Sequence, residues 1–291
     1  MSKFTIEHFR ATYPNDAICL DKIFQTRYGD LKICPSCGKE TQWRRITTRR
    51  AYQCRMCYFQ LYPTAGTVFE KTTTPLTYWF YVLYLFTVTR NGVAAKEIER
   101  QLGVTYKTAW RMGHQIRKLM KKNKGKLKGF VEVDETYMKT KETDTKPKTG
   151  RDTENKTPVL GMVERLGTVK AIALPDATKK SIFPQIEQHI DKSATVFTDD
   201  YLTYKRLSDD LGYRHGVINH SMKRYRWEDI STNTIEGFFS QLKRTIGGSH
   251  IWVSGKYLQN YLDECCFRYD NRNIGNMMFG VILDNMKKEW I

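Results

Sequence analysis

Four of the seven cysteines in this 291-residue chain stand in two close pairs. Cys34 and Cys37 form one C-x2-C turn, Cys54 and Cys57 form another, and 16 residues separate the two. Two such turns, or knuckles, can hold four thiolates in a tetrahedron around Zn²⁺, and the spacing fits a zinc ribbon. Gly38 supplies permissive backbone after the first pair. Because four thiolates leave no open coordination position, we expect one structural Zn²⁺.

Disulfides and a redox C-x-x-C are the alternatives for these cysteines. A chain without a secretion signal predicts a reducing cytosol, where this pattern more often binds metal. Nothing around either pair indicates the βαβ unit of a redox motif. The strand-like residues 41–52 would form the hairpin between the knuckles. For Cys19, Cys265 and Cys266, which lie in apolar helical patterns, buried thiols are the better interpretation.

Three acidic side chains in the second half could bind catalytic metal. Asp134 lies within a predicted strand, Asp199 at the end of a buried-type strand, and Glu236 in the first turns of a long helix. Converging carboxylates can hold two Mg²⁺ ions about 3.5–4 Å apart, which activate the attacking oxygen and stabilise the leaving oxygen of a phosphodiester. Isolated acidic residues are usually solvated surface, so spacing alone does not establish this site.

The elements that must position these carboxylates form an α/β pattern. Val131 and Val133 face one side of the first strand, and Glu132 and Asp134 face the other. Strands are predicted over 129–138, 158–164, 168–175 and 194–200, and helices over 179–189, 204–211 and from 231 onward. The polar residues 139–157 predict a mobile loop.

A helix-turn-helix is predicted between the ribbon and this domain. A buried helix begins after Pro75, and a shorter helix then ends at Gly103, with Thr105 as the N-cap of the next one. The last helix has an apolar stripe of Ala109, Met112, Ile116 and Leu119. Its basic face consists of Lys107, Arg111, His114 and Lys118, which we predict contact DNA in the major groove. Many helical hairpins share this pattern. The prediction of a DNA-binding helix-turn-helix therefore also depends on the neighbouring zinc ribbon and on the positive charge of the chain.

The chain carries 48 Lys and Arg against 31 Asp and Glu, and 48 − 31 gives a net charge of +17. Such a charge attracts polyanions and favours nucleic acid over a basic surface kept for solubility. No apolar run reaches the length of about 18 residues that a membrane helix needs, and the N-terminus lacks the apolar core of a signal peptide. We therefore expect a cytoplasmic, nucleoid-associated protein.

The order of these motifs resembles the ISXO-like insertion-sequence transposases of the DDE superfamily. Residues 27–30, 34–38 and 64–69 resemble the entry and exit of that family's ribbon. Residues 131–137, 198–199 and 232–244 resemble its three catalytic blocks, and residues 261–269 its C-terminal helix. The resemblance covers nearly the whole chain, and the last two blocks are the most specific.

This resemblance implies an RNase H-like fold with Asp134, Asp199 and Glu236 as catalytic ligands of Mg²⁺ or Mn²⁺. It also implies that Lys243 and Arg244, which follow the glutamate, touch DNA phosphate. Asp200 and Asn233 are alternative metal ligands. Ser231 stands where a histidine is expected, and His220 matches a family block that a structural hydrogen bond explains equally well.

Together these patterns predict an α/β (α+β) protein with four parts: an N-terminal helical segment (1–33), a zinc ribbon (34–70), a helix-turn-helix region (71–122) and an RNase H-like domain (128–285). The predicted function is a DNA transposase that binds terminal inverted repeats, hydrolyses the strand end and transfers its 3′-hydroxyl to target DNA. A homodimer or larger synaptic complex is expected, since two ends must be joined. The alternatives are a zinc-ribbon regulator and an RNase H-like nuclease without strand joining.

Overall fold

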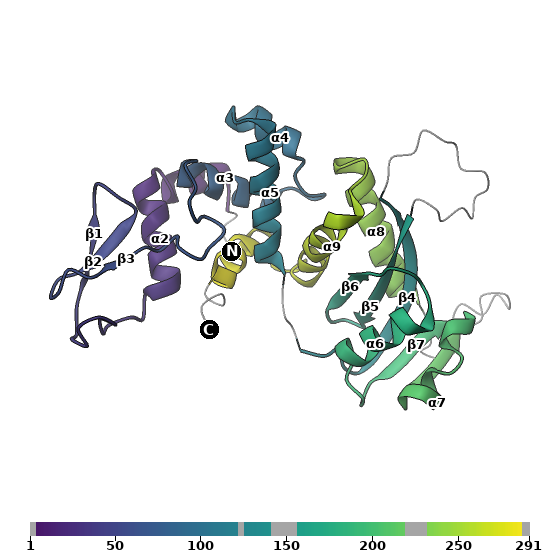
Figure 1. Ribbon diagram of the computed structural model, residues 1–291. Helices are drawn as coiled ribbons and strands as arrows, with labels where there is room; N and C mark the ends of the chain where they lie inside the picture. Colours follow the sequence, from purple (N-terminus) through teal and green to yellow (C-terminus); the bar gives the residue numbers. More distant parts are fainter. Residues whose placement is uncertain (1–3, 122–124, 141–155, 219–231, 287–291) are drawn as a thin grey trace. The chain divides into compact units, whose positions relative to one another are not determined.

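The computed structural model describes residues 4–121, 125–140, 156–218 and 232–286 (Figure 1). The chain forms two compact units, an N-terminal unit of residues 1–120 and 274–291 and a sheet unit of residues 121–273. No helix in the described ranges is long and apolar enough to cross a membrane. His220 and Ser231, and most of the loop predicted over 139–157, lie outside the described residues.

Helices form most of the N-terminal unit. The side chain of Asn15 caps the second helix by accepting from the Ile18 amide, and the thiol of Cys19 is fully buried inside that helix, as predicted. The third helix buries Trp79 and Phe80 completely, so its aromatic side chains are core. The helices are α1 (Ile6–Thr12), α2 (Asp16–Tyr28), α3 (Leu76–Val88), α4 (Ala95–Leu102), α5 (Tyr106–Met120) and α10 (Met278–Asp284), with a 3-10 turn η3 (Gly275–Met277).

The cysteine-rich region is a three-stranded antiparallel sheet of β1 (Trp43–Ile46), β2 (Ala51–Cys54) and β3 (Gln60–Leu61). The hairpin predicted over 41–52 is β1 and the start of β2. This sheet packs on α2, where the ring of Phe24 stacks on Tyr52 at 3.9 Å between centroids. Two ion pairs, Arg50 to Asp16 at 3.1 Å and Arg45 to Asp21 at 3.6 Å, add to the contact.

The turn between α4 and α5 has the predicted geometry. Gly103 takes the left-handed conformation with φ of 63°, which ends α4. The hydroxyl of Thr105 accepts from the Thr108 amide at 3.3 Å and so caps α5. Arg117 is buried on α5, with its guanidinium 5.2 Å from the Phe86 ring centroid on α3.

The last helix belongs to the N-terminal unit, although the sequence placed residues up to 285 in the RNase H-like domain. Phe279 of α10 is buried and contacts the rings of Phe9, Tyr13 and Phe80. The amide of Asn285 donates to the Leu119 carbonyl at 2.7 Å. Aromatic burial against distant helices therefore determines where this segment packs, which the local pattern could not reveal.

The sheet unit is built on a five-stranded sheet in the order β6-β5-β4-β7-β8. β4 pairs antiparallel with β5 and parallel with β7, and this mixed order is RNase H-like. The strand β8 was not predicted from the sequence, because its Arg-His-Gly-Val-Ile run is short and only partly apolar. The strands are β4 (Phe130–Lys139), β5 (Lys156–Glu164), β6 (Val169–Ala173), β7 (Thr195–Asp199) and β8 (Arg214–Ile218).

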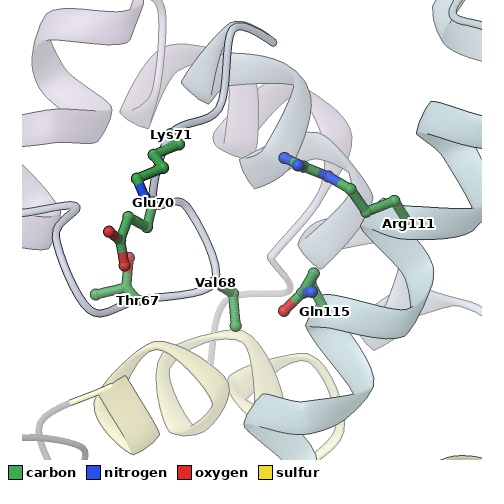
Figure 2. A pocket seen from close by; sticks show the side chains of 6 residues that line it. All are labelled: Thr67, Val68, Glu70, Lys71, Arg111 and Gln115. Atoms are coloured by element: carbon green, nitrogen blue, oxygen red, sulfur yellow. The ribbon is translucent and has the colours of Figure 1, made fainter.

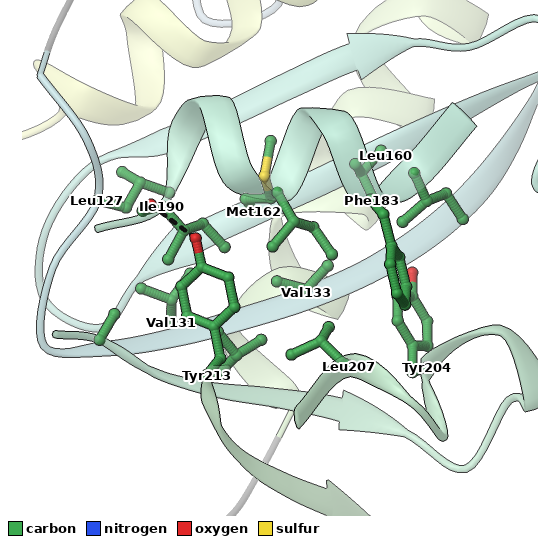
Figure 3. Close-up of a cluster of buried hydrophobic side chains, with 14 of the residues drawn as sticks. Leu127, Val131, Val133, Leu160, Met162, Phe183, Ile190, Tyr204, Leu207 and Tyr213 are labelled. Carbon is green, nitrogen blue, oxygen red and sulfur yellow. Dashed lines mark hydrogen bonds between the residues drawn. The ribbon is translucent and has the colours of Figure 1, made fainter. Parts of the chain in front are cut away.

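Helices cover both faces of this sheet. One face, with Val131 and Val133, packs with α6 (Lys179–His189) in a cluster that includes Tyr204 and Tyr213 (Figure 3). The hydroxyl of Tyr213 donates to the Ile190 carbonyl at 3.0 Å there. The other face packs with α8 (Asn233–Ser249) and α9 (Gly255–Asp270). The turn η1 (Leu202–Tyr204) and the helix α7 (Leu207–Leu211) link β7 to β8.

Candidate metal centres and DNA-contacting residues

The four knuckle cysteines converge on one point of the ribbon. Their sulfur atoms all lie within 4.8 Å of one another, with Cys34 to Cys57 at 3.7 Å and Cys37 to Cys54 at 4.0 Å. A tetrahedral site with zinc–sulfur bonds of about 2.3 Å has sulfur–sulfur edges of about 3.8 Å, so these cysteines fit zinc. All four are free thiols, so the alternative of a disulfide is not seen here.

The two knuckles use the same backbone hydrogen bonds. The amide of Gly38 donates to the Cys34 carbonyl at 2.9 Å, and the amide of Tyr58 donates to the Cys54 carbonyl at 3.1 Å. Both residues lie in the left-handed region, Gly38 with φ of 67° and Tyr58 with φ of 62°. The sequence indicated a left-handed backbone conformation only at the first knuckle, where the residue is glycine. A tyrosine does not indicate this conformation, so the second knuckle was not predicted to have it.

Asp134 and Asp199 lie on neighbouring parallel strands. The register pairs Glu132 of β4 with Phe197 of β7, and two residues further along both strands come Asp134 and Asp199. Asp134 and Asp199 therefore each follow, by two residues, the last paired positions of two neighbouring central strands. Both are partly exposed. The amide of Glu135 donates to Asp134 at 2.8 Å, and the amide of Tyr201 donates to Asp199 at 3.2 Å.

Both carboxylates point to the face that α8 covers. On β4, Val131 and Val133 belong to the core on the α6 side, while Glu132 bonds to α8. Strand alternation places Asp134 on the same face as Glu132. On β7, Val196 belongs to the α6 side, so Asp199, three residues on, lies on the α8 side. Glu236 lies one turn into α8, the helix that covers this face.

Glu132 fastens the start of α8 to β4. Its fully buried carboxylate accepts from the Thr234 amide at 2.9 Å, the Ile235 amide at 3.1 Å and the Thr234 hydroxyl at 3.0 Å. The guanidinium of Arg165 donates to the same carboxylate at 2.9 Å and balances its charge. The free amides at a helix N-terminus favour an anion. Glu132 thus sets the position of Glu236 relative to Asp134, a role that the sequence did not reveal.

Gly161 lets α8 lie directly against the sheet beside Asp134. It pairs with Asp134 in the β4–β5 register. A Cβ atom at this position would lie 2.6 Å from Ile235 and 2.6 Å from Phe239 of α8. A larger residue would have to displace these two buried side chains, so the packing of α8 on this strand relies on the glycine.

Glu236 is exposed and accepts a hydrogen bond from the Thr232 hydroxyl at 3.1 Å. In the described part of the chain, the cysteines are the one set of three or more potential ligands within 4.8 Å. Asp134, Asp199 and Glu236 do not form such a set in this structure. Of the alternative ligands, Asp200 is exposed just beyond β7, and Asn233 is exposed as the first residue of α8.

Glu135 lies next to Asp134 but on the opposite face of β4. The hydroxyl of Tyr204 donates to its carboxylate. Burial raises the pKa of Glu135 to about 7, with the negative charges of Asp134 and Asp199 adding to the effect and the Tyr204 hydrogen bond opposing it. The pKa of Tyr204 is raised by its burial and by the same carboxylates. Both shifts therefore include a contribution from the negative charges of Asp134 and Asp199.

The predicted DNA-contacting residues fall into two groups. Lys107, Arg111 and Lys118 are exposed on α5, and Lys243 and Arg244 are exposed on α8. Arg111 and Gln115 project from α5 over a hollow of about 340 Å³ whose opposite wall is the loop with Thr67, Val68, Glu70 and Lys71 (Figure 2).

His114 departs from the prediction for the basic face. It is 6 % exposed and packs against the Trp110 ring, with centroids 4.0 Å apart. Because α3 and α10 also contact α5, the middle of that helix is covered. Periodicity correctly placed His114 on the stripe of Lys107 and Lys118, but tertiary packing removes its side chain from the surface that DNA could reach.

The fold and these sites define an RNase H-like protein with an acidic face and a zinc-ribbon module. Residues 126–270 match the ISXO2-like transposase domain, and residues 14–60 match the transposase zinc-ribbon domain. The chain belongs to this family of transposases. The ribbon match begins within the predicted helical segment and includes α2, which agrees with the packing of α2 on the ribbon.

One curated relative is an uncharacterised protein in transposable element ISH50 of Halobacterium salinarum. It is 28 % identical over 267 residues, which cover 86 % of this chain and 90 % of the relative. Among solved structures, a simian T-cell lymphotropic virus intasome in complex with PP2A regulatory subunit B56 gamma is similar at 14 % identity and a TM-score of 0.34, covering 60 % of this chain and 64 % of that one. A pre-cleavage Mos1 transpososome is similar at 10 % identity and a TM-score of 0.20, covering 68 % and 78 %. At these low TM-scores the likeness supports no conclusion about this chain.

Proposed function

We propose that this chain is the transposase of an insertion sequence, and that it cleaves the ends of the element and joins them to target DNA. The observation that supports the proposal is that Asp134 and Asp199 lie on paired parallel strands, two residues beyond the last paired positions, and that Glu132 bonds to the start of the helix that carries Glu236. Family membership supports the same assignment. The ribbon and the α4–α5 pair would bind the terminal inverted repeats.

In this proposal the three carboxylates would hold Mg²⁺ or Mn²⁺ ions, which would supply activation of the attacking oxygen and stabilisation of the leaving oxygen of a phosphodiester. Oxygen ligands from carboxylates are the chemistry that these ions prefer. The protein supplies position: β4 and β7 fix two acids, and the Glu132 anchor fixes the third. Lys243 and Arg244 on α8 would hold the DNA phosphates near the acids.

The ribbon would hold one Zn²⁺ through Cys34, Cys37, Cys54 and Cys57, with a structural role. Lys107, Arg111 and Lys118 would face the DNA from α5, in keeping with the second helix of a helix-turn-helix. Because two element ends must be joined, we propose that the active species is a homodimer or a larger complex on DNA.

The proposal is tested by incubating the protein with supercoiled plasmid and Mn²⁺ or Mg²⁺. We expect nicking by the wild type and its loss in Asp134→Asn and Glu236→Gln, with DNA affinity kept within a few-fold. Joining of a 3′-hydroxyl oligonucleotide carrying the element's end to the plasmid separates a transposase from a nuclease that only cuts. Equal nicking by wild type and Asp134→Asn would place the chemistry elsewhere, and loss of DNA binding in these variants would make the carboxylates structural.

A further inference from the structure

Tyr58 holds a backbone conformation that disfavours its own side chain. Within the described ranges, the non-glycine residues with positive φ are Tyr58, Lys71, Leu166 and Ile251. Tyr58 stands at the knuckle position that Gly38 holds in the other half of the ribbon, with the same hydrogen bond to the first cysteine of its pair. A side chain in this region clashes with its own backbone, and glycine avoids that clash.

Core packing does not explain why the second knuckle carries a tyrosine. Tyr58 is 70 % exposed, and Met56, on the other side of Cys57, is 55 % exposed. Phe59 is 38 % exposed directly after them. We call Met56, Tyr58 and Phe59 the knuckle tip. A strained residue whose ring faces solvent points to a functional use of that ring.

The surroundings of the knuckle tip are strongly basic. Residues 34–62 contain six basic side chains and one acidic side chain, and 6 − 1 gives +5. A bound zinc ion with four thiolates would add a charge of 2 − 4 = −2, so the net charge of residues 34–62 would be +3. Two of the arginines, Arg45 and Arg50, are ion-paired with α2. The exposed arginines are Arg44, Arg49 and Arg55.

We propose that the knuckle tip is a DNA-contacting element, in which Tyr58 and Met56 press against bases while Arg44, Arg49 and Arg55 contact the flanking phosphates. Exposed apolar side chains among cations fit DNA, since aromatic and apolar side chains pack on base faces and edges and arginines neutralise the backbone. The net positive charge argues against a second copy of this equally basic ribbon as the occupant. The proposal rests on the proposed function, in which the ribbon binds DNA, and it names the residues that do so.

The test uses the full-length protein and a fluorescein-labelled 40-base-pair duplex of mixed sequence, with affinity measured by anisotropy over a series of KCl concentrations. Tyr58→Gly is the central variant, because glycine relaxes the backbone there and should keep the ribbon folded. Leu166→Gly is the matched control, since Leu166 is also exposed with a positive φ of 59° but lies in the β5–β6 turn of the other unit. Arg55→Ala reports on the phosphate contacts.

We expect Tyr58→Gly to keep its zinc and its Tm while binding the duplex at least about fivefold more weakly, with an unchanged slope of affinity against salt. Arg55→Ala should lower that slope by about one. Leu166→Gly should bind like the wild type.

Wild-type affinity in Tyr58→Gly would overturn the inference while leaving the proposed function intact. A change of oligomeric mass in Tyr58→Gly with unchanged DNA affinity would also overturn it, by making the knuckle tip a protein contact. Failure of the wild type itself to bind the duplex would instead refute the DNA-binding role of the proposed function.

Discussion

The ribbon and the proposed carboxylate site on the acidic face of the sheet are built in different ways by the fold. The ribbon collects its four thiolates from two short turns, each of which fixes its own pair of cysteines through local hydrogen bonds. The acidic face takes Asp134, Asp199 and Glu236 from two strands and a helix that are far apart in the sequence. The thiolates gather within 4.8 Å, and the acids do not.

The two sites therefore depend on different kinds of contact: local turns and bound metal in the ribbon, and contacts between distant elements in the sheet unit. A closed thiolate site is rigid because the metal itself would complete the fold of a segment too small to have a core. An open carboxylate site, as we propose for the acidic face, would have to be preorganised by the surrounding protein, through strand pairing, Gly161 and the contact of Glu132 with α8. Removal of metal should therefore damage the ribbon, while removal of the anchor should damage the acidic face.

The largest effect should come from Cys34→Ser. Loss of one thiolate removes zinc, and structural zinc supplies about 10 kcal/mol or more of apparent folding free energy in small zinc domains. We expect zinc content to fall and residues 34–62 to become sensitive to limited proteolysis.

Cys19→Ala is the control for this variant, because it removes a buried thiol outside the knuckles and should keep one zinc per chain. A zinc-free Cys34→Ser protein with a protease-resistant ribbon would contradict the metal site.

Glu132→Ala should have the next largest effect and should be confined to the sheet unit. It removes the carboxylate that accepts from the Arg165 guanidinium and from the first amides of α8, and breaking such a buried pair costs about 3–5 kcal/mol. We expect faster hydrogen exchange in residues 232–249 and a higher metal concentration for half-maximal nicking.

Glu132→Gln is the conservative comparison, since it keeps the shape and one acceptor oxygen and should lie between wild type and Glu132→Ala. Zinc content should be unchanged in both variants. Wild-type exchange in α8 of Glu132→Ala would show that the anchor does not hold the helix.

The smallest effect concerns pH and Glu135. Its pKa is about 7 in the folded protein against 4.5 in its ordinary state, so the folded protein favours the protonated form. The stability that this preference provides is fully present below pH 4.5 and is lost as pH rises through about 7. Without divalent metal, the urea midpoint of the sheet unit should fall between pH 5.5 and 8, and Glu135→Gln should flatten that fall. An identical pH dependence of the urea midpoint in wild type and Glu135→Gln would show that Glu135 does not cause the fall.

The ribbon could be predicted almost completely from the sequence because its information is local. The C-x2-C spacing, the hairpin between the pairs and the glycine of the first knuckle all appear within 24 residues, from Cys34 to Cys57. The turn at Gly103 and the cap at Thr105 were predicted for the same reason. Tyr58 was not, because its backbone conformation is set by the knuckle and contradicts the preference of its residue type.

In the sheet unit, the sequence indicated the strands of Asp134 and Asp199 and the helix of Glu236, and the family resemblance joined them into one site. The strand β8 was not predicted, since pairing with β7 rather than its own pattern makes it a strand. His114 was placed on the right stripe, but its burial depends on helices from elsewhere in the chain.

Residue types, periodicity and short-range spacing can be read directly from the chain, and they specify the thiolate set, the capped helices and the alternation that puts Glu132 and Asp134 on one face. Tertiary packing alone established that β4 and β7 pair as neighbouring parallel strands, which brings the strands of Asp134 and Asp199 together. It also decided that Glu132 caps a helix 102 residues away and that α10 packs with the N-terminal helices. Turns, caps and alternation depend on residues close together in the sequence. Contacts between distant segments depend instead on which apolar surfaces pack together in the folded chain, and the local sequence does not specify this.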